Sequence, residues 1–260
     1  MQIEVIIEKK SHKLDAEEGK TILETLQEHG IHVLTAPCGG RGRCGKCTVE
    51  VEHMGEVLAC MTKVTDGMRI TIPKVQLRAQ KSKIAENGTV THYPADDGEG
   101  LDAACDIGTT TVVCHLIDGK TGEKLATGSE PSAQRSFGAD VLSRIQAAEA
   151  GKLEILKEQI IFQIAQMLRT LQKKTGRGEQ IQRLAVVGNT VMCHLFAGIS
   201  PVSIGVTPFM PQEFFGKEYT GEQLGLTDCR SVYIAPAVAG FVGGDITSDL
   251  LAVMQKNPKE

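Results

Sequence analysis

The chain has 260 residues, a length that allows one large domain or two smaller ones. Its composition, 41% hydrophobic and 23% charged, excludes a wholly disordered, collagen-like or coiled-coil protein. The formal net charge of -4 gives no electrostatic reason to expect a nucleic acid as partner. The N-terminus lacks the pattern of an export signal, and no window approaches the ~20 apolar residues of a membrane span. We therefore expect a cytoplasmic protein with no membrane or nucleic-acid partner.

Residues 1–75 predict a small domain of short strands around one helix. Apolar residues alternate with polar ones over residues 3–7, which indicates the first arm of a hairpin. Thr21 and Glu24 have the spacing of a capping box at a helix start, and Gly30 supplies the stop signal. Further short strands are predicted at residues 49–51, 57–58 and 68–72.

Residues 76–100 are charged and rich in turn formers, and they predict a linker. A second domain is predicted over residues 101–260, where strands and helices alternate. Its predicted elements are a strand pair within 103–117, a returning strand at 124–127, helices at 141–148 and 153–171, a strand at 184–187, a helix at 190–197, a strand at 231–235 and a helix at 245–255.

The cysteines are unevenly distributed along the chain. Four of the eight, Cys38, Cys44, Cys47 and Cys60, lie close together, whereas Cys105, Cys114, Cys193 and Cys229 stand singly in or beside apolar runs. Buried single thiols pack as small hydrophobic groups, and disulfides are not expected in a chain without an export signal. We therefore interpret the second group as structural thiols and the first as a metal or redox centre.

The clustered cysteines have the spacing Cys-x5-Cys-x2-Cys-x12-Cys. A zinc ribbon normally has two Cys-x2-Cys knuckles, and this chain has one, so three ligands on a Gly-rich loop with a distant fourth favour a single [2Fe-2S] cluster. Zinc and a metal-free structural quartet are the alternatives. Glycines allow backbone N–H groups to approach cluster sulfurs closely. Arg41, Arg43 and Lys46 add positive charge, either as a solvated rim or as a docking surface.

Four segments carry a resemblance to a known family. They are PCGGRGRCGKC with the LAC around Cys60, DIGTTTV at 106–112, VVGNTVM at 186–192 and IAPAVAGFVGGD at 234–245. The chain resembles the reductive activators of corrinoid proteins, although its Cys-x5-Cys spacing departs from the plant-type Cys-x4-Cys pattern. The resemblance implies an α+β domain at 1–75, a β-grasp [2Fe-2S] ferredoxin fold, followed by the linker. At 101–260 it implies an α/β domain, the first ribonuclease-H-like lobe of an ATPase of the acetate kinase, sugar kinase, Hsp70 and actin type.

The segment after Asp106 is a candidate phosphate loop. A strand ending in Asp106 and followed by Gly108, Thr109 and Thr110 can turn N–H groups and hydroxyls toward a triphosphate, while the carboxylate holds Mg²⁺ or its water. The same residues also describe an ordinary hairpin. Asn189 with Thr190, and Asp245, each open a predicted helix, where N-capping explains them as well as contact with a ligand does.

The resemblance implies an iron-sulfur electron-transfer protein that uses ATP to return an inactive Co(II) corrinoid to Co(I). Its partners would be a corrinoid protein of a methyltransferase system and an upstream low-potential reductant. The family's second ATPase lobe is not in this sequence, so we expect weak nucleotide binding unless that lobe is supplied separately. The alternatives are a simple [2Fe-2S] electron carrier with a non-catalytic second domain, and one half of an ATPase that is completed in trans.

Overall fold

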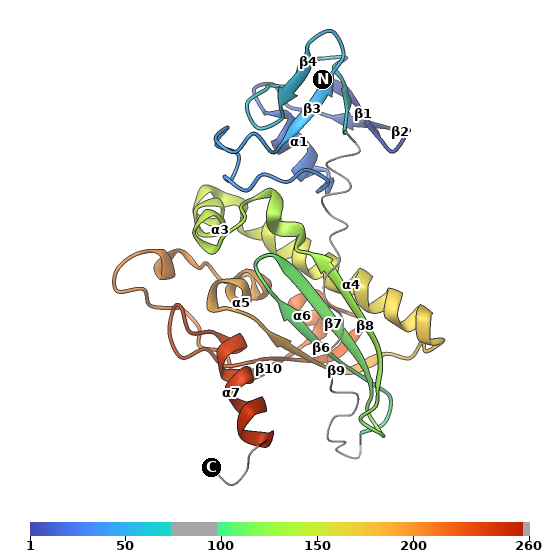
Figure 1. Cartoon of the computed structure of the whole chain (residues 1–260), viewed down its shortest axis with the longest axis vertical. Helices are drawn as coiled ribbons and strands as arrows, with labels where there is room; N and C mark the ends of the chain where they lie inside the picture. The colour runs from blue at the N-terminus through green and yellow to red at the C-terminus, as the bar shows by residue number, and fades with distance from the viewer. Residues whose placement is uncertain (74–97, 257–260) are drawn as a thin grey trace. The chain divides into compact units, whose positions relative to one another are not determined.

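The structure is a computed structural model that describes residues 1–73 and 98–256. Residues 74–97, which include most of the linker predicted at 76–100, lie outside the described residues. The chain forms two compact units, which are Met1–Lys83 with Ala133–Ala147, and Ile84–Ser132 with Ala148–Glu260. Figure 1 shows the elements of both units, coloured along the chain.

The first unit contains a five-stranded mixed sheet with one helix. Its elements are β1 (Gln2–Ile7), β2 (Lys10–Asp15), α1 (Ile22–Glu28), β3 (Thr48–Val51), β4 (Gly55–Leu58) and β5 (Arg69–Thr71). The strand order is β2-β1-β5-β3-β4, with β1 and β5 parallel and the other pairs antiparallel. This is the β-grasp arrangement that the sequence predicted.

Helix α1 begins where its capping box predicts. The Thr21 hydroxyl accepts the Glu24 N–H at 3.2 Å, and the Glu24 carboxylate accepts the Thr21 N–H at 2.9 Å. Two otherwise unpaired N–H groups of the first turn are thereby satisfied. The helix buries Ile22 and Leu26 completely against the sheet, where they meet the alternating side chains of β1, β3 and β5.

The same unit includes the 3-10 helix η1 (Ala133–Ser136) and helix α3 (Val141–Ala147). The buried Gln27 amide donates to the Ser136 carbonyl at 2.9 Å. Arg144 is fully buried, and its guanidinium donates to the Gly138 carbonyl and the Gln134 side chain. Burial lowers the pKa of Arg144 to about 10. Hydrogen bonds of this kind are what makes burial of an arginine tolerable.

The second unit is built on a six-stranded sheet of order β10-β11-β9-β6-β7-β8. The strands are β6 (Leu101–Ile107), β7 (Thr111–Asp118), β8 (Lys124–Pro131), β9 (Ile181–Val187), β10 (Lys217–Thr220) and β11 (Cys229–Ile234). β6, β9 and β11 are parallel, and the β6-β7-β8 meander and the β10 edge are antiparallel. This is the ribonuclease-H-like topology predicted for the second domain. The carboxyl ends of three parallel strands therefore share one edge of the sheet.

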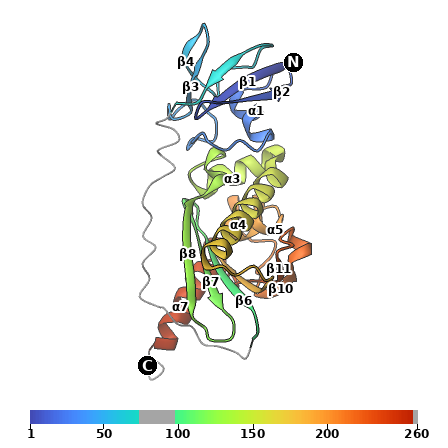
Figure 2. The ribbon, with the colours of Figure 1, turned by 90° about the vertical axis from the view of Figure 1, so that its right-hand side faces the viewer.

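The helices of this unit are α4 (Leu153–Thr175), α5 (Thr190–Ala197), α6 (Gly221–Leu224) and α7 (Gly244–Lys256), with a π-helical turn η2 (Ala148–Lys152) and a 3-10 turn η3 (Val202–Gly205). Figure 2 shows α4 running along the sheet beside β7 and β8. Leu156, Ile160, Ile164 and Leu168 recur at helical spacing on α4 and are fully buried, so this amphipathic helix covers one face of the sheet. Gly151, with a φ of 82°, lies inside η2 and interrupts the helical backbone before α4 begins.

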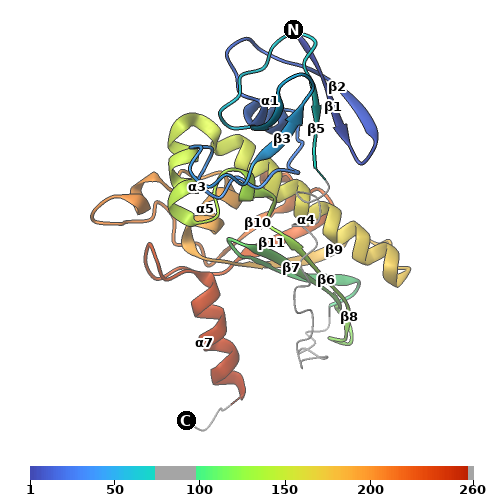
Figure 3. The ribbon, with the colours of Figure 1, turned by 45° about the horizontal axis from the view of Figure 1, so that its top comes forward.

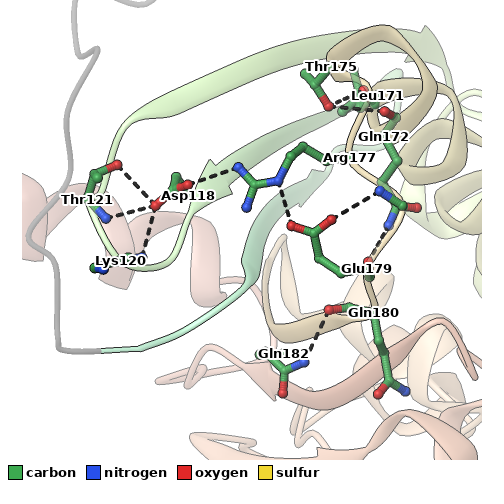
Figure 4. Close-up of polar contacts among 11 residues, drawn as sticks. Asp118, Lys120, Thr121, Leu171, Gln172, Thr175, Arg177, Glu179, Gln180 and Gln182 are labelled. Carbon is green, nitrogen blue, oxygen red and sulfur yellow. Dashed lines mark hydrogen bonds and ion pairs between the residues drawn. The ribbon is translucent and has the colours of Figure 1, made fainter.

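A polar network closes the end of the sheet at which β7 turns into β8 (Figure 4). The Asp118 carboxylate accepts N–H bonds from Lys120 and Thr121 at 3.0 and 2.9 Å, and it pairs with the Arg177 guanidinium at 3.0 Å. Arg177 also contacts Glu179 at 2.5 Å. The hydrogen bond from Arg177, with those of the turn, lowers the pKa of Asp118 to about 2. The returning strand predicted at 124–127 is confirmed as part of β8.

Two features of this unit differ from the sequence interpretation. Cys105 and Cys114, interpreted as single structural thiols, are joined by a disulfide because the β6–β7 register places them opposite each other. The sequence analysis also did not anticipate β10 and α6. The short edge strand β10 buries little apolar surface and so lacks a strong alternating pattern.

Helix α7 projects from the strands of the second unit, as Figure 3 shows. Its apolar residues Ile246, Leu250, Leu251, Val253 and Met254 are exposed. Among the described helices, none has both the length and the apolar run needed to cross a membrane.

Candidate functional site

The four clustered cysteines lie at one end of the first unit. Cys38, Cys44 and Cys47 belong to the loop between α1 and β3, and Cys60 directly follows β4 and Ala59. The Ala59 N–H donates to the Cys47 carbonyl at 2.9 Å, and the Leu23 N–H donates to the Ala59 carbonyl at the same distance. These two bonds tie the distant fourth cysteine to the end of the loop and to α1.

The loop directs backbone N–H groups at the Cys38 thiol. Burial raises the pKa of Cys38, but hydrogen bonds from the backbone and side chain of Cys44, and from the backbones of Arg43 and Arg41, outweigh it and bring the pKa down to about 7. A set of N–H donors around one sulfur stabilises its thiolate form. Arg41, Arg43 and Lys46 all have exposed side chains on this loop.

Cys60 is in the opposite situation, although it belongs to the same group. Burial, followed by a hydrogen bond and charge interaction with Cys47, raises the pKa of Cys60 to about 12, and the Gly42 N–H opposes this only in part. The charge on Cys38 also contributes to the increase. Four thiolates therefore repel one another here unless a cation lies between them.

Two glycines show how closely the loop is packed. Gly42 has a φ of 71°, and a Cβ placed on it would lie 2.8 Å from the Met61 sulfur. Gly40 has a φ of 80°, and a Cβ there would contact Leu23 and the Cys60 Cβ. A larger residue would strain the backbone at both positions because of the positive φ, and at Gly42 it would also force the Met61 side chain to move.

The thiols approach one another in two pairs, Cys38 with Cys44 and Cys47 with Cys60. Within residues 1–73 and 98–256, no three Cys, His, Asp or Glu side chains form a compact group of metal-ligand geometry. Two thiol pairs fit a two-iron centre, because each iron of a [2Fe-2S] core takes two thiolates.

A second candidate site lies at the carboxyl edge of the parallel strands in the second unit. Asp106 is exposed near the end of β6, and Gly108, Thr109 and Thr110 form the turn into β7. A Cβ on Gly108 would lie 2.6 Å from the Thr111 carbonyl oxygen, so the tight turn requires glycine. The Thr110 carbonyl accepts the Ser132 N–H at 2.9 Å, which fixes the turn to the end of β8.

Asn189 connects this turn to the next strand and helix. Its side-chain oxygen accepts the Met192 N–H at 3.0 Å as the N-cap of α5, and its amide donates to the Thr109 hydroxyl at 3.1 Å. The capping role and the contact with the phosphate motif therefore coexist in one side chain. Thr190, in contrast, is buried and donates to the Ala239 carbonyl at 2.7 Å, which is a structural role.

Asp245 approaches Asp106 from the start of α7. Its N–H donates to the Gly188 carbonyl at 3.1 Å, and Gly243 packs so tightly on Asn189 that a Cβ would lie 2.6 Å from the Asn189 Cα. The crowding of the Asp106 carboxyl by neighbouring atoms, together with the charges of Asp245 and Asp249, raises the pKa of Asp106 to about 6.

Sequence reasoning missed Asp249, which lies one helical turn after Asp245 on α7, a spacing that could have indicated a shared face. The three carboxylates interact electrostatically, but in the described residues they do not converge as a three-ligand metal site. Mg²⁺ commonly uses one or two carboxylates and keeps its waters, so Asp106 suits magnesium held jointly with phosphate oxygens.

The comparisons with known proteins give the family of the second domain and the cofactor of the first. A family model described as the RACo middle region matches residues 101–257, more than half of the chain. The chain belongs to this family. A model described as a 2Fe-2S iron-sulfur cluster binding domain matches residues 4–74, so the cofactor of the first domain is a [2Fe-2S] cluster, as predicted.

Two relatives extend over most of the chain. The corrinoid activation enzyme RamQ of Eubacterium limosum is 26% identical over 299 residues, which cover 85% of this chain and 50% of RamQ. A solved structure titled reductive activator for corrinoid, iron-sulfur protein has a TM-score of 0.58 and 24% identity, and the match covers 99% of this chain and 59% of that one. The chain thus spans between half and three fifths of the length of these two proteins, and the structural likeness shows the fold.

Proposed function

We propose that Cys38, Cys44, Cys47 and Cys60 are the ligands of the cluster and that this chain is an electron-transfer protein. The observation that carries the proposal is the presence of two thiol pairs, Cys38 with Cys44 and Cys47 with Cys60, with backbone N–H groups that donate to Cys38 and Cys60. Bound there, a [2Fe-2S] cluster supplies reversible one-electron chemistry. The chain's own residues set the surroundings, with the loop N–H groups stabilising negative charge on the sulfurs and the buried Cys47 and Cys60 keeping water from one side.

We propose a nucleotide site at Asp106, Gly108, Thr109 and Thr110. The turn offers N–H groups and hydroxyls to phosphate oxygens, and Asp106 would hold Mg²⁺ or its water. Asn189 would position Thr109 through the 3.1 Å hydrogen bond, and Asp245 would add a second carboxylate near the metal. The site's place at the carboxyl ends of parallel strands supports the proposal, since ligands of open α/β sheets bind at such edges.

We further propose that the chain takes part in ATP-dependent reduction of a corrinoid protein from Co(II) to Co(I), as the names of its relatives suggest. In this proposal residues 1–75 carry the cluster, residues 76–100 are the linker between the two domains, and residues 101–260 form one ATPase lobe. An upstream low-potential reductant supplies the electron, the acceptor belongs to a methyltransferase system, and the process takes place in the cytoplasm. A second lobe, present in the same protein or supplied by another, would enclose the nucleotide, because one lobe leaves most of it exposed.

Single-turnover electron transfer tests this function. The cluster-loaded protein, reduced by titanium(III) citrate under argon, is mixed with a Co(II) corrinoid protein with and without MgATP, and Co(I) is followed by its absorbance. The assay is repeated with the remaining half of a relative such as RamQ supplied as a separate polypeptide. Co(I) formation that requires MgATP, and that Asp106→Asn abolishes without changing the cluster spectrum, is the expected result.

Two other outcomes have clear meanings. Electron transfer that is independent of nucleotide in every arm would make the chain a simple [2Fe-2S] carrier with a non-catalytic second domain. A cluster that titanium(III) reduces but that never passes its electron to the corrinoid would contradict the proposed acceptor.

A further inference from the structure

Cys105 and Cys114 form a pair that neither the cluster nor the nucleotide proposal uses. They lie directly opposite each other in the antiparallel β6–β7 ladder, nine positions apart in the sequence, with a Cα–Cα distance of 4.3 Å and a bond between their sulfurs. This matches the ~4.5 Å spacing of the closer type of antiparallel pair, in which side chains of one face approach most nearly. The ladder therefore holds the two sulfurs within bonding reach.

The pair is enclosed by the core of the second unit. Both cysteines are essentially inaccessible to solvent, at 1% and 0% exposure. Their neighbours on the same face of the two strands are also buried, and these are Ala103 opposite Leu116 and Ile107 opposite Val112. A protein thiol or a bulky disulfide cannot reach sulfurs in such a place, whereas a molecule as small as hydrogen peroxide can enter when the strands open briefly.

The other two buried cysteines provide a contrast. Cys193 and Cys229 are free thiols, and each lacks a facing cysteine. Burial, with the charges of Asp245 and Asp106, raises the pKa of Cys193 to about 12, and burial does the same for Cys229. These residues are suitable internal controls, because they share burial with the pair and lack its geometry.

Because of its position, the oxidation state of the pair affects the turn between β6 and β7. Cys105 immediately precedes Asp106, and Cys114 lies three residues after Thr111, at which β7 begins. A bond between them closes a covalent ring around the turn that contains Gly108, Thr109 and Thr110. Separation of the two strands next to this turn is then blocked as long as the bond persists.

We propose that Cys105 and Cys114 are a redox modification site, a dithiol that a hydroperoxide converts to a disulfide and that thereby fixes the β6–β7 turn. One thiol loses its proton and its sulfur attacks an oxygen of hydrogen peroxide, the O–O bond breaks, a sulfenic acid forms, and the leaving hydroxide takes up the released proton as one water. The second thiol attacks the sulfenic sulfur, the S–S bond forms, and a second water leaves. Two electrons pass from the sulfurs to the peroxide, and a small dithiol reductant reverses the change by thiol–disulfide exchange when local unfolding of the surrounding core exposes the bonded sulfurs. The proposal does not depend on the cluster or on the corrinoid function.

Peptide mass spectrometry tests the chemistry on the full chain. Samples reduced by dithiothreitol under argon, and parallel samples exposed to hydrogen peroxide, are denatured in N-ethylmaleimide and digested with trypsin. No Lys or Arg lies between positions 84 and 119, so both cysteines fall in one peptide that ends at Lys120. We expect this peptide to carry two maleimide groups in the reduced sample. After peroxide it should carry no maleimide group, and its mass should be lower than that of the unmodified dithiol peptide by two hydrogens. Cys193 and Cys229 should remain alkylated throughout.

Variants and a second readout complete the test. Cys105→Ser should leave Cys114 alkylated after the same exposure, whereas Cys193→Ser should still form the bond. Hydrogen exchange of residues 106–112 should slow about tenfold on oxidation in the wild-type protein and not in Cys105→Ser. The proposal would be overturned if both cysteines were still alkylated after peroxide, or if hydrogen exchange of residues 106–112 were equal in both redox states. The alkylation of the wild-type protein remains decisive even if a variant folds poorly.

Discussion

The eight cysteines occupy three different chemical environments. Four converge near residues 38–60, two face each other in a strand pair, and two are buried alone. Spacing along the sequence was enough to predict the first group, because three of its members share one loop. It could not predict the second group, since the meeting of Cys105 and Cys114 depends on the strand register.

Cys60 allows the ligand assignment to be tested one residue at a time. We expect Cys60→Ser to lose most of its iron during anaerobic gel filtration, because a hydroxyl is a much poorer ligand than a thiolate for this soft centre. Cys229→Ser, a matched change at a buried cysteine of the other unit, should keep its iron and its visible spectrum. Iron and sulfide analysis of the two variants provides the measurement, and equal retention would remove Cys60 from the ligand set.

Asn189 has two roles that substitutions can separate. Asn189→Ala should lower the free energy of unfolding by about 1 kcal/mol through loss of the α5 N-cap. Asn189→Asp keeps a capping oxygen but removes the N–H that reaches Thr109, so it should be nearly as stable as wild type. Its affinity for MgATP should still fall about tenfold, since the lost hydrogen bond positions the phosphate turn. Urea unfolding measures the first effect, and calorimetric titration with the second ATPase lobe supplied as a separate polypeptide measures the second. An unchanged affinity in Asn189→Asp would exclude a positioning role.

At the scale of single elements, the turn between β7 and β8 depends on the charge of Asp118. Its pKa is lowered to about 2 by the Arg177 hydrogen bond and the turn N–H groups, so the folded state favours the ionised carboxyl. The stabilisation is complete above the unfolded pKa near 4 and is lost as the pH falls through 2. We expect Asp118→Asn to have a lower Tm than wild type at pH 6, and the difference to shrink steadily toward pH 3. A Tm difference that is constant over this range would show that the carboxylate charge is not involved.

The elements with strong local signals were predictable from sequence. The capping box of α1, the 3.6-residue periodicity of α4 and the Asn189 cap of α5 each specify a helix with little help from the rest of the chain. The strand β10 was missed, because an edge strand of four residues that pairs on one side only is selected by the neighbouring β11. For such a strand, tertiary pairing decides the conformation and local propensity does not.

At the scale of the whole molecule, function depends on which residues the two topologies bring together. The β-grasp sheet returns the chain from β4 to the cysteine loop, so that Cys60 meets Cys47. In the second unit the parallel strands β6 and β9 end at one edge, where Asp106 meets the start of α7. The sequence motifs predicted the four cysteines of the first candidate site and Asp106, Gly108, Thr109 and Thr110 of the second. Asp249 was beyond their reach, because its proximity to Asp106 comes from the placement of α7 on β9.

The central claim is that the cysteine loop holds a two-iron cluster, and the most direct measurement is metal and sulfide analysis combined with electron paramagnetic resonance. Protein purified under argon should contain about two irons and two acid-labile sulfides per chain. It should give no electron paramagnetic resonance signal as isolated, and it should show close to one S = 1/2 spin per chain after reduction by titanium(III). A colourless protein that contains zinc and develops no spin signal on reduction would contradict the account.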